Sequence, residues 1–466
     1  MNTTMTNPST EPALTESERI ARFAVQLQAS DIPPDVKELA KEHLLDTLGI
    51  AIASSGFDFG SVILKGVRAL GEGGPATGIG SGVSLPASSA ALLNGVLAHG
   101  LDYDDTHIAG IYHASAPALA ASFAAGQASN ASGNEVLVAF TAAVEIGCRL
   151  ALAAAGDLTH RGFHPTAVCG TFAAAVAAGR LFKLNEQQLT YALGLCGSQA
   201  SGILEMGTSW LKRFHPGWSA HSGVVAAVLG QAGFVGPATT LEGSRGFYAT
   251  HVQRIPSGER APSFELGQTW HALGIALKPY PCCHVIHAAV DAALELRSQF
   301  DLAAIERIEC PLTLEWHKLI AEPRDACIRP ANAYRALFSV QYVVALALAR
   351  GRVDLAAFYD EPLDAPDVLD IAARVWCIDD PLSDYPAHFP GEVIVHLKDG
   401  RVVRTRRAAS LGTQEFPLAR EAIKAKFMSN ATRVIDPEAA GQLMKRVFEL
   451  EREASLGEIM RLSRPN

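Results

Sequence analysis

The sequence predicts a mainly α protein with an α+β second domain, in which a large all-helical domain lies beside a smaller α+β lid domain. Apolar residues at helical spacing, preceded by capping residues, dominate the first 260 residues. Alternating apolar residues and an Asp-Gly turn follow within residues 308–403, and helical patterns return after about residue 408. We therefore expect a disordered tail at 1–15, a helical domain formed by 16–269 and 408–466, and the lid domain at 270–407.

The helical domain carries explicit helix starts. They are Thr15 with Glu18, Pro33 to Asp35, Asn185 with Gln188, and Asp436 with Pro437. The alanine-rich segments 114–128 and 171–180 predict helices that pack closely through small side chains. A glycine-rich run at 78–82 misses the spacing of a dinucleotide-binding motif. We interpret it as a turn before a helix at Pro86 rather than as a nucleotide site.

The lid domain is predicted from strand patterns. Apolar residues alternate over 308–314, and Pro311 within this run predicts a strand near a sheet edge. Residues 393–397 and 401–403 form a hairpin pattern around Asp399-Gly400, which suits a type I′ turn. A helix is expected between these strands at 334–350.

Bulk composition excludes several classes of protein. A length of 466 residues suggests two or three domains, and 48% hydrophobic with 19% charged residues indicates a globular chain. The net charge of −9, without a basic cluster, argues against a nucleic-acid partner. The longest apolar run, 135–155, is interrupted by Glu145 and Arg149, so we expect no membrane span. These two residues are either an intrahelical pair or part of a site.

The cysteine pattern indicates free thiols. None of the eight cysteines forms a C-x-x-C pair, and no histidine spacing completes a zinc site. We expect a cytoplasmic protein with reduced cysteines and no metal. For Cys282 and Cys283 we favour packing over nucleophilic catalysis.

Residues 99–107 are the most informative segment, because three carboxylates and two imidazoles fall within nine residues after an apolar helix at 87–98. Taken alone, the segment could be a solvated acidic loop. We assign function to Asp102 and Thr106. Asp104 and Asp105 are expected to cap the next helix or pair with a basic side chain, and His99 and His107 to be structural.

Four further segments gather ionisable side chains among small residues. They are 112–117, 161–166, 212–217 with His221, and 278–287. A single histidine in such a loop is usually structural, but several together supply proton transfer near neutral pH. Lysines can bind carboxylates or stabilise an enolate, and Asp102 could orient a histidine. This chemistry requires neither a metal nor an organic cofactor, so we expect none.

Six short motifs occur along the chain in the order in which one known protein family carries them. They are Asn94-Gly95 with His99 and Asp102 to Thr106; Gly162 to Thr166; Lys212, His215 and Gly217, continuing to Gly243; Lys278 to Cys282 with His287; Phe338-Ser339; and Lys426-Phe427. From about residue 36 to 430 the chain resembles the MmgE/PrpD family. That family includes 2-methylcitrate dehydratases, cis-aconitate decarboxylases and iminodisuccinate epimerase. The resemblance implies a homodimer with an MmgE/PrpD-like helical domain and lid, and an active site between them.

The resemblance also implies roles for individual residues. The catalytic residues are expected to be His113, His164, Asp102 and Lys212, and the substrate-binding residues Thr106, Lys278, His284, His287 and His215. Members similar to the decarboxylases carry a histidine where Cys283 stands here, with His284 one residue later. At this position the chain departs from that branch.

The leading hypothesis is a cofactor-independent lyase, a dehydratase or decarboxylase, acting on a small di- or tricarboxylic acid such as 2-methylcitrate or cis-aconitate. His164 or His113 would remove a proton alpha to a carboxylate held by Lys212 and Lys278. An epimerase of an amino- or iminodicarboxylate, of the iminodisuccinate type, needs the same groups and is the alternative. A non-catalytic helical dimer scaffold is the alternative from another class.

Overall fold

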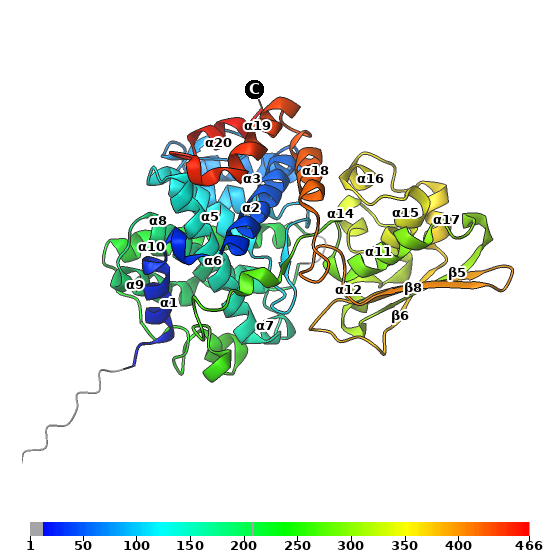
Figure 1. The fold of residues 1–466 in the computed structure, drawn as a ribbon, viewed down its shortest axis with the longest axis horizontal. Helices are drawn as coiled ribbons and strands as arrows, with labels where there is room; N and C mark the ends of the chain where they lie inside the picture. The colour runs from blue at the N-terminus through cyan, green and yellow to red at the C-terminus, as the bar shows by residue number, and fades with distance from the viewer. Residues whose placement is uncertain (1–12, 207–208, 466) are drawn as a thin grey trace, which may run out of the picture.

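The computed structural model describes residues 13–206 and 209–465 and consists of a large helical body beside a smaller part built on a β-sheet (Figure 1). The predicted fold class is confirmed. Two separate apolar cores underlie the division, one within the helical body and one between the sheet and its covering helices. The tail expected at 1–15 lies almost wholly outside the described residues, and the expected domain limits stay a prediction.

The helical body combines both ends of the chain, and α18 and α19 pack against α2. Its helices are α1 (Glu16–Gln26), α2 (Pro34–Ser55), α3 (Asp58–Leu70), α4 (Ala87–Ala98), α5 (Ser115–Ala128), α6 (Gly133–Ala154), α7 (Asp157–His160), α8 (Pro165–Leu181), α9 (Glu186–Gln199), α10 (Leu211–Gln231), α18 (Arg420–Ala431), α19 (Pro437–Phe448) and α20 (Gly457–Leu462). All four predicted helix starts are confirmed, at α1, α2, α9 and α19.

The interface between α4 and α10 depends on glycine. A Cβ added to Gly95 would lie 2.6 Å from the Cα of Gly217, and one added to Gly217 would lie 2.4 Å from the carbonyl oxygen of Leu92. Both distances are shorter than van der Waals contact, so only glycine allows this approach. The helix after the acidic segment, α5, also packs against α10. The alanine-rich segments 114–128 and 171–180 lie in α5 and α8, and these helices pack against each other and against α10. A Cβ added to Gly223 of α10 would lie 2.5 Å from the Cβ of Ala174, so the predicted close packing through small side chains is confirmed.

We expect Gly95→Ala to lower the free energy of unfolding by about 1–3 kcal/mol, because the added methyl group overpacks a backbone contact. Gly66→Ala on α3 is the matched control. An added Cβ there meets nothing within 4 Å, and alanine's helix propensity should raise stability by about 0.5–1 kcal/mol. Urea unfolding midpoints measure both. Equal effects of the two substitutions would contradict the packing argument.

The smaller part contains a four-stranded sheet in the order β6-β5-β7-β8, with α11 and α15 packed on it. Its elements are α11 (His287–Leu296), β5 (Ile305–Leu312), α12 (His317–Ile320), α13 (Arg324–Ile328), α14 (Ala333–Ala336), α15 (Val340–Arg350), α16 (Leu355–Tyr359), α17 (Pro366–Ala372), β6 (Val375–Asp379), β7 (Gly391–Leu397) and β8 (Val402–Arg407). Strand β5 runs parallel to β6, and the other neighbours are antiparallel.

The predicted edge position of the strand at 308–314 is wrong. Strand β5 is an interior strand, and Leu314 lies beyond its end with 62% of its surface exposed. Pro311 is tolerated because pairing with β7 ends at Glu309. The missing N–H of Pro311 faces that unpaired side, since Ile308 N–H and Leu312 C=O bond on the β6 side.

Two further details differ from expectation. In the β7–β8 turn Gly400 adopts φ +86°, whereas Asp399 keeps a negative φ, so the turn is not type I′. Gly400 N–H donates to Leu397 O instead, as in a type I turn followed by a left-handed glycine. The helix expected at 334–350 is broken into α14 and α15, because Ser339 caps a new helix by accepting from Tyr342 N–H.

The glycine-rich run at 78–82 is a turn, as predicted. It connects the short strands β1 (Ala76–Thr77) and β2 (Ser84–Leu85), and α4 follows directly after Pro86. Gly80 and Gly82 both adopt positive φ there.

Helix α6 is long and apolar enough to cross a bilayer, but 94% of its most apolar stretch is buried inside the protein. Helices α2 and α3 would pass the same test as one span only across an 88° bend. The pair Glu145–Arg149 is intrahelical, at 2.5 Å. Glu145 accepts from Ala272 N–H, and Arg149 donates to Thr269 O. The pair therefore anchors residues 269–272 to α6.

Candidate active site

The acidic segment connects the helical body to the smaller part. Helix α4 ends at Ala98, and the chain then turns into the short strand β3 (Thr106–His107), which pairs with β4 (Ile275–Ala276). His107 Nδ1 accepts from Gly110 N–H at 3.1 Å, which is the structural role expected of it. The whole segment from His99 to His107 is buried, so the solvated-loop alternative is wrong.

A cavity of about 310 Å³ lies between the two parts of the molecule. Its walls include seven of the nine predicted site residues: Asp102, Thr106, His113, His164, Lys212, Lys278 and His284. His215 and His287 do not line it. His215 contacts His164 from behind, and His287 Nε2 contacts Cys282 O at 3.1 Å. Cys283, the position that departs from the decarboxylase-like pattern, also faces the cavity.

Asp102 is the charged centre of one wall. Its carboxylate forms ion pairs with Lys212 on α10 and with Lys278, whose Nζ lies 3.3 Å from Oδ1 and 2.9 Å from the Asp102 carbonyl oxygen. Burial would raise the pKa of Asp102, but the two lysines outweigh it and hold the pKa well below its usual range. Burial opposes the charge of Lys212, but Asp102 outweighs it and raises the pKa of the ammonium.

The backbone at Asp102 is strained, since φ is +50° at a residue with a side chain. The Oδ2 atom of Asp102 is buried and has no hydrogen-bond partner in the described structure. This oxygen lacks the hydrogen bond that buried polar atoms normally make.

The prediction that Asp102 orients a histidine is wrong. Asp104 has that contact instead, because both of its oxygens lie 2.8 Å from His99 Nδ1. Asp102 lies within reach of two lysines that come from distant parts of the chain, and the opposite charges attract it more strongly than a neutral imidazole would. His99 is thus a buried partner of the site that does not line the cavity.

The prediction that Asp105 caps the next helix or pairs with a basic side chain is confirmed. It accepts from Ser115 N–H at 3.1 Å at the start of α5, and its other oxygen lies 2.5 Å from His43 Nδ1 on α2. Burial would raise the pKa of Asp105, but His43 and Ser115 lower it. The carboxylate therefore ties α2, the acidic segment and α5 together.

The hydrogen bonds of His113 define its tautomer. His113 Nδ1 lies 2.8 Å from the carbonyl oxygen of Asp105, which can only accept, so Nδ1 carries the hydrogen. Nε2 is left with a free lone pair. Burial, assisted by the charges of Lys212 and Lys278, lowers the pKa of His113 to about 3. His113 is a neutral imidazole at pH 7 and can act as a base.

His164 begins α8 and contacts a second histidine. Its Nδ1 lies 2.9 Å from His215 Nδ1, so one ring donates to the other. The ring that donates has a free acceptor at Nε2, and the ring that accepts has a donor there. Burial lowers the pKa of both, that of His215 to about 4. The tautomers of the pair therefore decide whether His164 presents a lone pair or an N–H group at Nε2.

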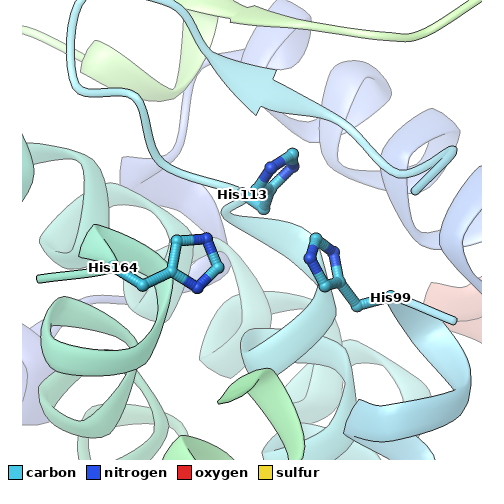
Figure 2. Close-up of side chains that lie close together, drawn as sticks. All are labelled: His99, His113 and His164. Atoms are coloured by element: carbon cyan, nitrogen blue, oxygen red, sulfur yellow. The ribbon is translucent and has the colours of Figure 1, made fainter. Parts of the chain in front are cut away.

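Figure 2 shows the rings of His99, His113 and His164 gathered around a common space. Each offers a nitrogen atom, and these atoms lie within 4.8 Å of one another, so the three rings could hold a metal ion. His99, Asp102 and Asp104 form a second group that meets the same distance. Lys212 and Lys278 lower the pKa of His99 and His113 through their charge, and the same charge opposes a cation. The expectation of a metal-free site stays a prediction.

Sequence reasoning missed several residues of the cavity wall. Tyr334 and Arg335 on α14 face it, as do Trp316, Leu319 and Phe389. No local pattern marks them, because they reach the cavity only when the smaller part folds over the helical body. Phe338, part of a recognised motif, lies under the Lys212 ammonium at 5.2 Å from the ring centre.

A pH dependence follows from Asp104. Burial raises its pKa to about 6 although His113 and Lys278 oppose this. Below pH 6 Asp104 is protonated and no longer accepts a hydrogen bond from His99 Nδ1 as a charged carboxylate. We therefore expect kcat/KM to fall by up to tenfold per pH unit. Because the folded-state pKa is raised, any stability contributed by this group is present at low pH and is lost as the pH rises through about 6. Asp104→Asn should remove the acid limb, and an unchanged limb would contradict the assignment.

Fold and site together define a two-domain, mainly helical protein in which a cavity between the domains gathers imidazole and ammonium groups. The chain belongs to the MmgE/PrpD family. The MmgE/PrpD N-terminal domain matches residues 18–257, and the MmgE/PrpD C-terminal domain matches residues 280–450. The resemblance read from the motifs is thereby confirmed.

Similar curated proteins cover nearly the whole chain. A cis-aconitate decarboxylase-like protein, oryM, of Aspergillus oryzae is 26% identical over 98% of this chain and 99% of its own length. A cis-aconitate decarboxylase of Aspergillus terreus is 27% identical over 95% of this chain and 94% of its own. The Homo sapiens cis-aconitate decarboxylase is 27% identical over 91% and 89%.

Proposed function

We propose that the protein is a lyase that removes water or carbon dioxide from a small polycarboxylic acid. The observation that carries the proposal is the convergence of two neutral imidazoles and two ammonium groups on one cavity. Membership of the family and the similarity to cis-aconitate decarboxylases support the same reaction class. The candidate substrates are small di- and tricarboxylic acids, and 2-methylcitrate and cis-aconitate are the first to be assayed.

The residues have distinct roles in this proposal. Lys212 and Lys278 bind a substrate carboxylate and stabilise the charge that develops on it when the adjacent carbon loses a proton. His113 Nε2 takes that proton, because its tautomer leaves the lone pair free. An anionic substrate beside His113 raises the pKa of the imidazole and makes it a stronger base.

His164 supplies the second proton as an imidazolium, because the anionic substrate raises the pKa of His164 as it raises that of His113. In a dehydration the bond from carbon to hydroxyl breaks, and His164 protonates the departing hydroxyl, which leaves as water. In a decarboxylation a histidine protonates the substrate carbon, the carbon–carbon bond breaks and carbon dioxide leaves. After a dehydration the proton held by His113 returns to His164 through water, which restores both imidazoles to their starting protonation states.

Proton NMR in deuterated water tests the proposal. The purified protein is incubated with cis-aconitate and, separately, with 2-methylcitrate, and loss of substrate, new vinyl signals and deuterium incorporation are followed. His113→Gln should lower kcat by about 10²–10⁴-fold. His160→Gln on α7, a histidine that does not line the cavity, is the control and should keep full activity. Full turnover by His113→Gln would reject this assignment.

An epimerase is the second candidate, because two neutral histidines line the cavity with ring centres 6.2 Å apart. Such an enzyme needs one proton-transfer group on each face of a carbon atom. Deuterium incorporation with inversion and no eliminated product would establish the epimerase over the lyase.

We further propose that the protein is a homodimer in a reducing compartment such as the cytoplasm. Exposed apolar side chains on and after α10 support a contact surface; they are Trp218, Val228, Leu229, Phe234 and Val235. All eight cysteines are free. Light scattering should give twice the 49.4 kDa chain mass, and a monomer at micromolar concentration would reject the dimer.

A further inference from the structure

The charges on the cavity wall are few and do not balance. Among the described residues the lining includes three groups that carry a positive charge, Lys212, Lys278 and Arg335, and one carboxylate, Asp102. Burial lowers the pKa of His113 to about 3 and holds the pKa values of His164 and His284 well below the usual range, so none of the three rings adds charge at pH 7. Two positive charges therefore remain for a bound molecule to neutralise.

Cys283 adds no charge to this wall. Its thiol faces the cavity, and burial together with the negative charge of Asp102 raises its pKa, although Lys212 opposes this. The side chain beside the lysines at this position is therefore small and uncharged.

A second group of lining side chains is apolar. It consists of Met206, Trp316, Leu319 and Phe389. The rings of Trp316 and Phe389 are 6.4 Å apart, and Phe389 also packs beside His284. A third carboxylate placed against this surface would lose its water without gaining a counter-ion, which is costly.

We propose that the substrate carries two carboxylates and an apolar substituent of several carbon atoms. The two carboxylates neutralise the net charge of the cavity, and the substituent covers the apolar part. The cavity of about 310 Å³ has room for both groups, since it corresponds to about ten water molecules at ~30 Å³ each. This inference rests on the proposed function and names its substrate class.

A ligand series tests the inference without turnover. The dissociation constants of succinate, 2-methylsuccinate, 2-butylsuccinate and 2-hexylsuccinate are measured by calorimetry, together with propane-1,2,3-tricarboxylate. Each added methylene should tighten binding about three- to fourfold up to the length of the cavity. The tricarboxylate should bind more weakly than 2-butylsuccinate.

A matched pair of variants locates the effect. Leu319→Ser places a hydroxyl in the apolar part and should reduce the gain to below twofold per methylene. Leu314 is five residues earlier, is 62% exposed and does not line the cavity, so Leu314→Ser should keep the gain of the unmodified protein. An equal gain in affinity per methylene for the two variants would mean that the alkyl chain does not contact Leu319, and it would overturn the inference.

The outcomes separate this inference from the proposed function. Turnover of a polycarboxylate combined with a flat alkyl series, or with tightest binding of the tricarboxylate, overturns the inference and leaves the lyase standing. A rising alkyl series without turnover of any alkylated or simple acid supports the cavity assignment and rejects the lyase.

Discussion

Replacing Lys212 by methionine is expected to lower kcat/KM by about 10³-fold. Lys212 lines the cavity, its ammonium is paired with Asp102, and its pKa is raised, so it is a fixed positive charge at the reacting group. Removing one such preorganised group costs about 10²–10³-fold. The loss of charge balance at Asp102 adds to this effect, since a buried carboxylate then keeps only Lys278.

The size of the effect has to be separated from general damage to the fold. Lys183→Met is the control, because Lys183 is 66% exposed and pairs with Glu135 away from the cavity. It should retain activity within twofold. Lys212→Arg keeps the charge but changes its shape, so kcat should fall more than KM changes. If Lys212→Met kept a tenth or more of the parent kcat/KM, the electrostatic role would be wrong.

Replacing Lys426 by methionine is expected to lower the free energy of unfolding by about 3–5 kcal/mol. Lys426 on α18 is buried, with its Nζ 2.8 Å from Asp46 Oδ1 on α2 and 2.9 Å from the carbonyl oxygen of Tyr103. Without the ammonium, the Asp46 carboxylate is a buried charge with no counter-ion. The same change removes the donor that holds the backbone next to Asp102.

The pH dependence of that loss has a definite sign. Burial raises the pKa of Asp46 even with Lys426 present, and removing the cation raises it further. A carboxyl with a raised folded-state pKa stabilises the protein at low pH and loses this contribution as the pH rises through that pKa. The deficit of Lys426→Met should therefore be largest at neutral pH and shrink on acidification. Urea unfolding midpoints between pH 5 and 8 measure it.

Two companion variants make the result specific to the buried pair. The double variant Asp46→Asn with Lys426→Met should recover part of the loss at neutral pH, because it removes the unpaired charge. Lys424→Met on the same helix is the control, since Lys424 pairs only with the exposed Glu421, and it should change stability by less than about 0.5 kcal/mol. A deficit below 1 kcal/mol for Lys426→Met would contradict the argument.

Local signals in the sequence predicted the helical body well. Thr15 with Glu18 and Asn185 with Gln188 form reciprocal caps that involve only residues three apart. Two errors are local, namely the type of the β7–β8 turn and the helix break at Ser339. The others concern contacts between distant segments. Pro311 is compatible with an interior strand because its neighbour β7 stops pairing at Glu309, and nothing local to Pro311 indicates where another strand ends.

The candidate site shows the same division. Its loops were recognised because histidines, lysines and carboxylates are concentrated in short segments, and His113, His164, Lys212 and Lys278 do line one cavity. The partner of Asp102 was predicted incorrectly. Lys212 and Lys278 lie 110 and 176 residues away from it along the chain, so their pairing is a property of the packed structure.

The sequence by itself determined the family, the helix starts and the kinds of side chain available for proton transfer and for binding carboxylates. These follow from short-range patterns, in which the interacting residues are near neighbours in the chain. Only the tertiary structure decided that Asp102 binds two lysines, that His113 keeps a free lone pair at Nε2, and that Trp316, Leu319 and Phe389 give the cavity an apolar side. The physical reason is that charge pairing, tautomer and burial depend on which distant groups exclude water from one another.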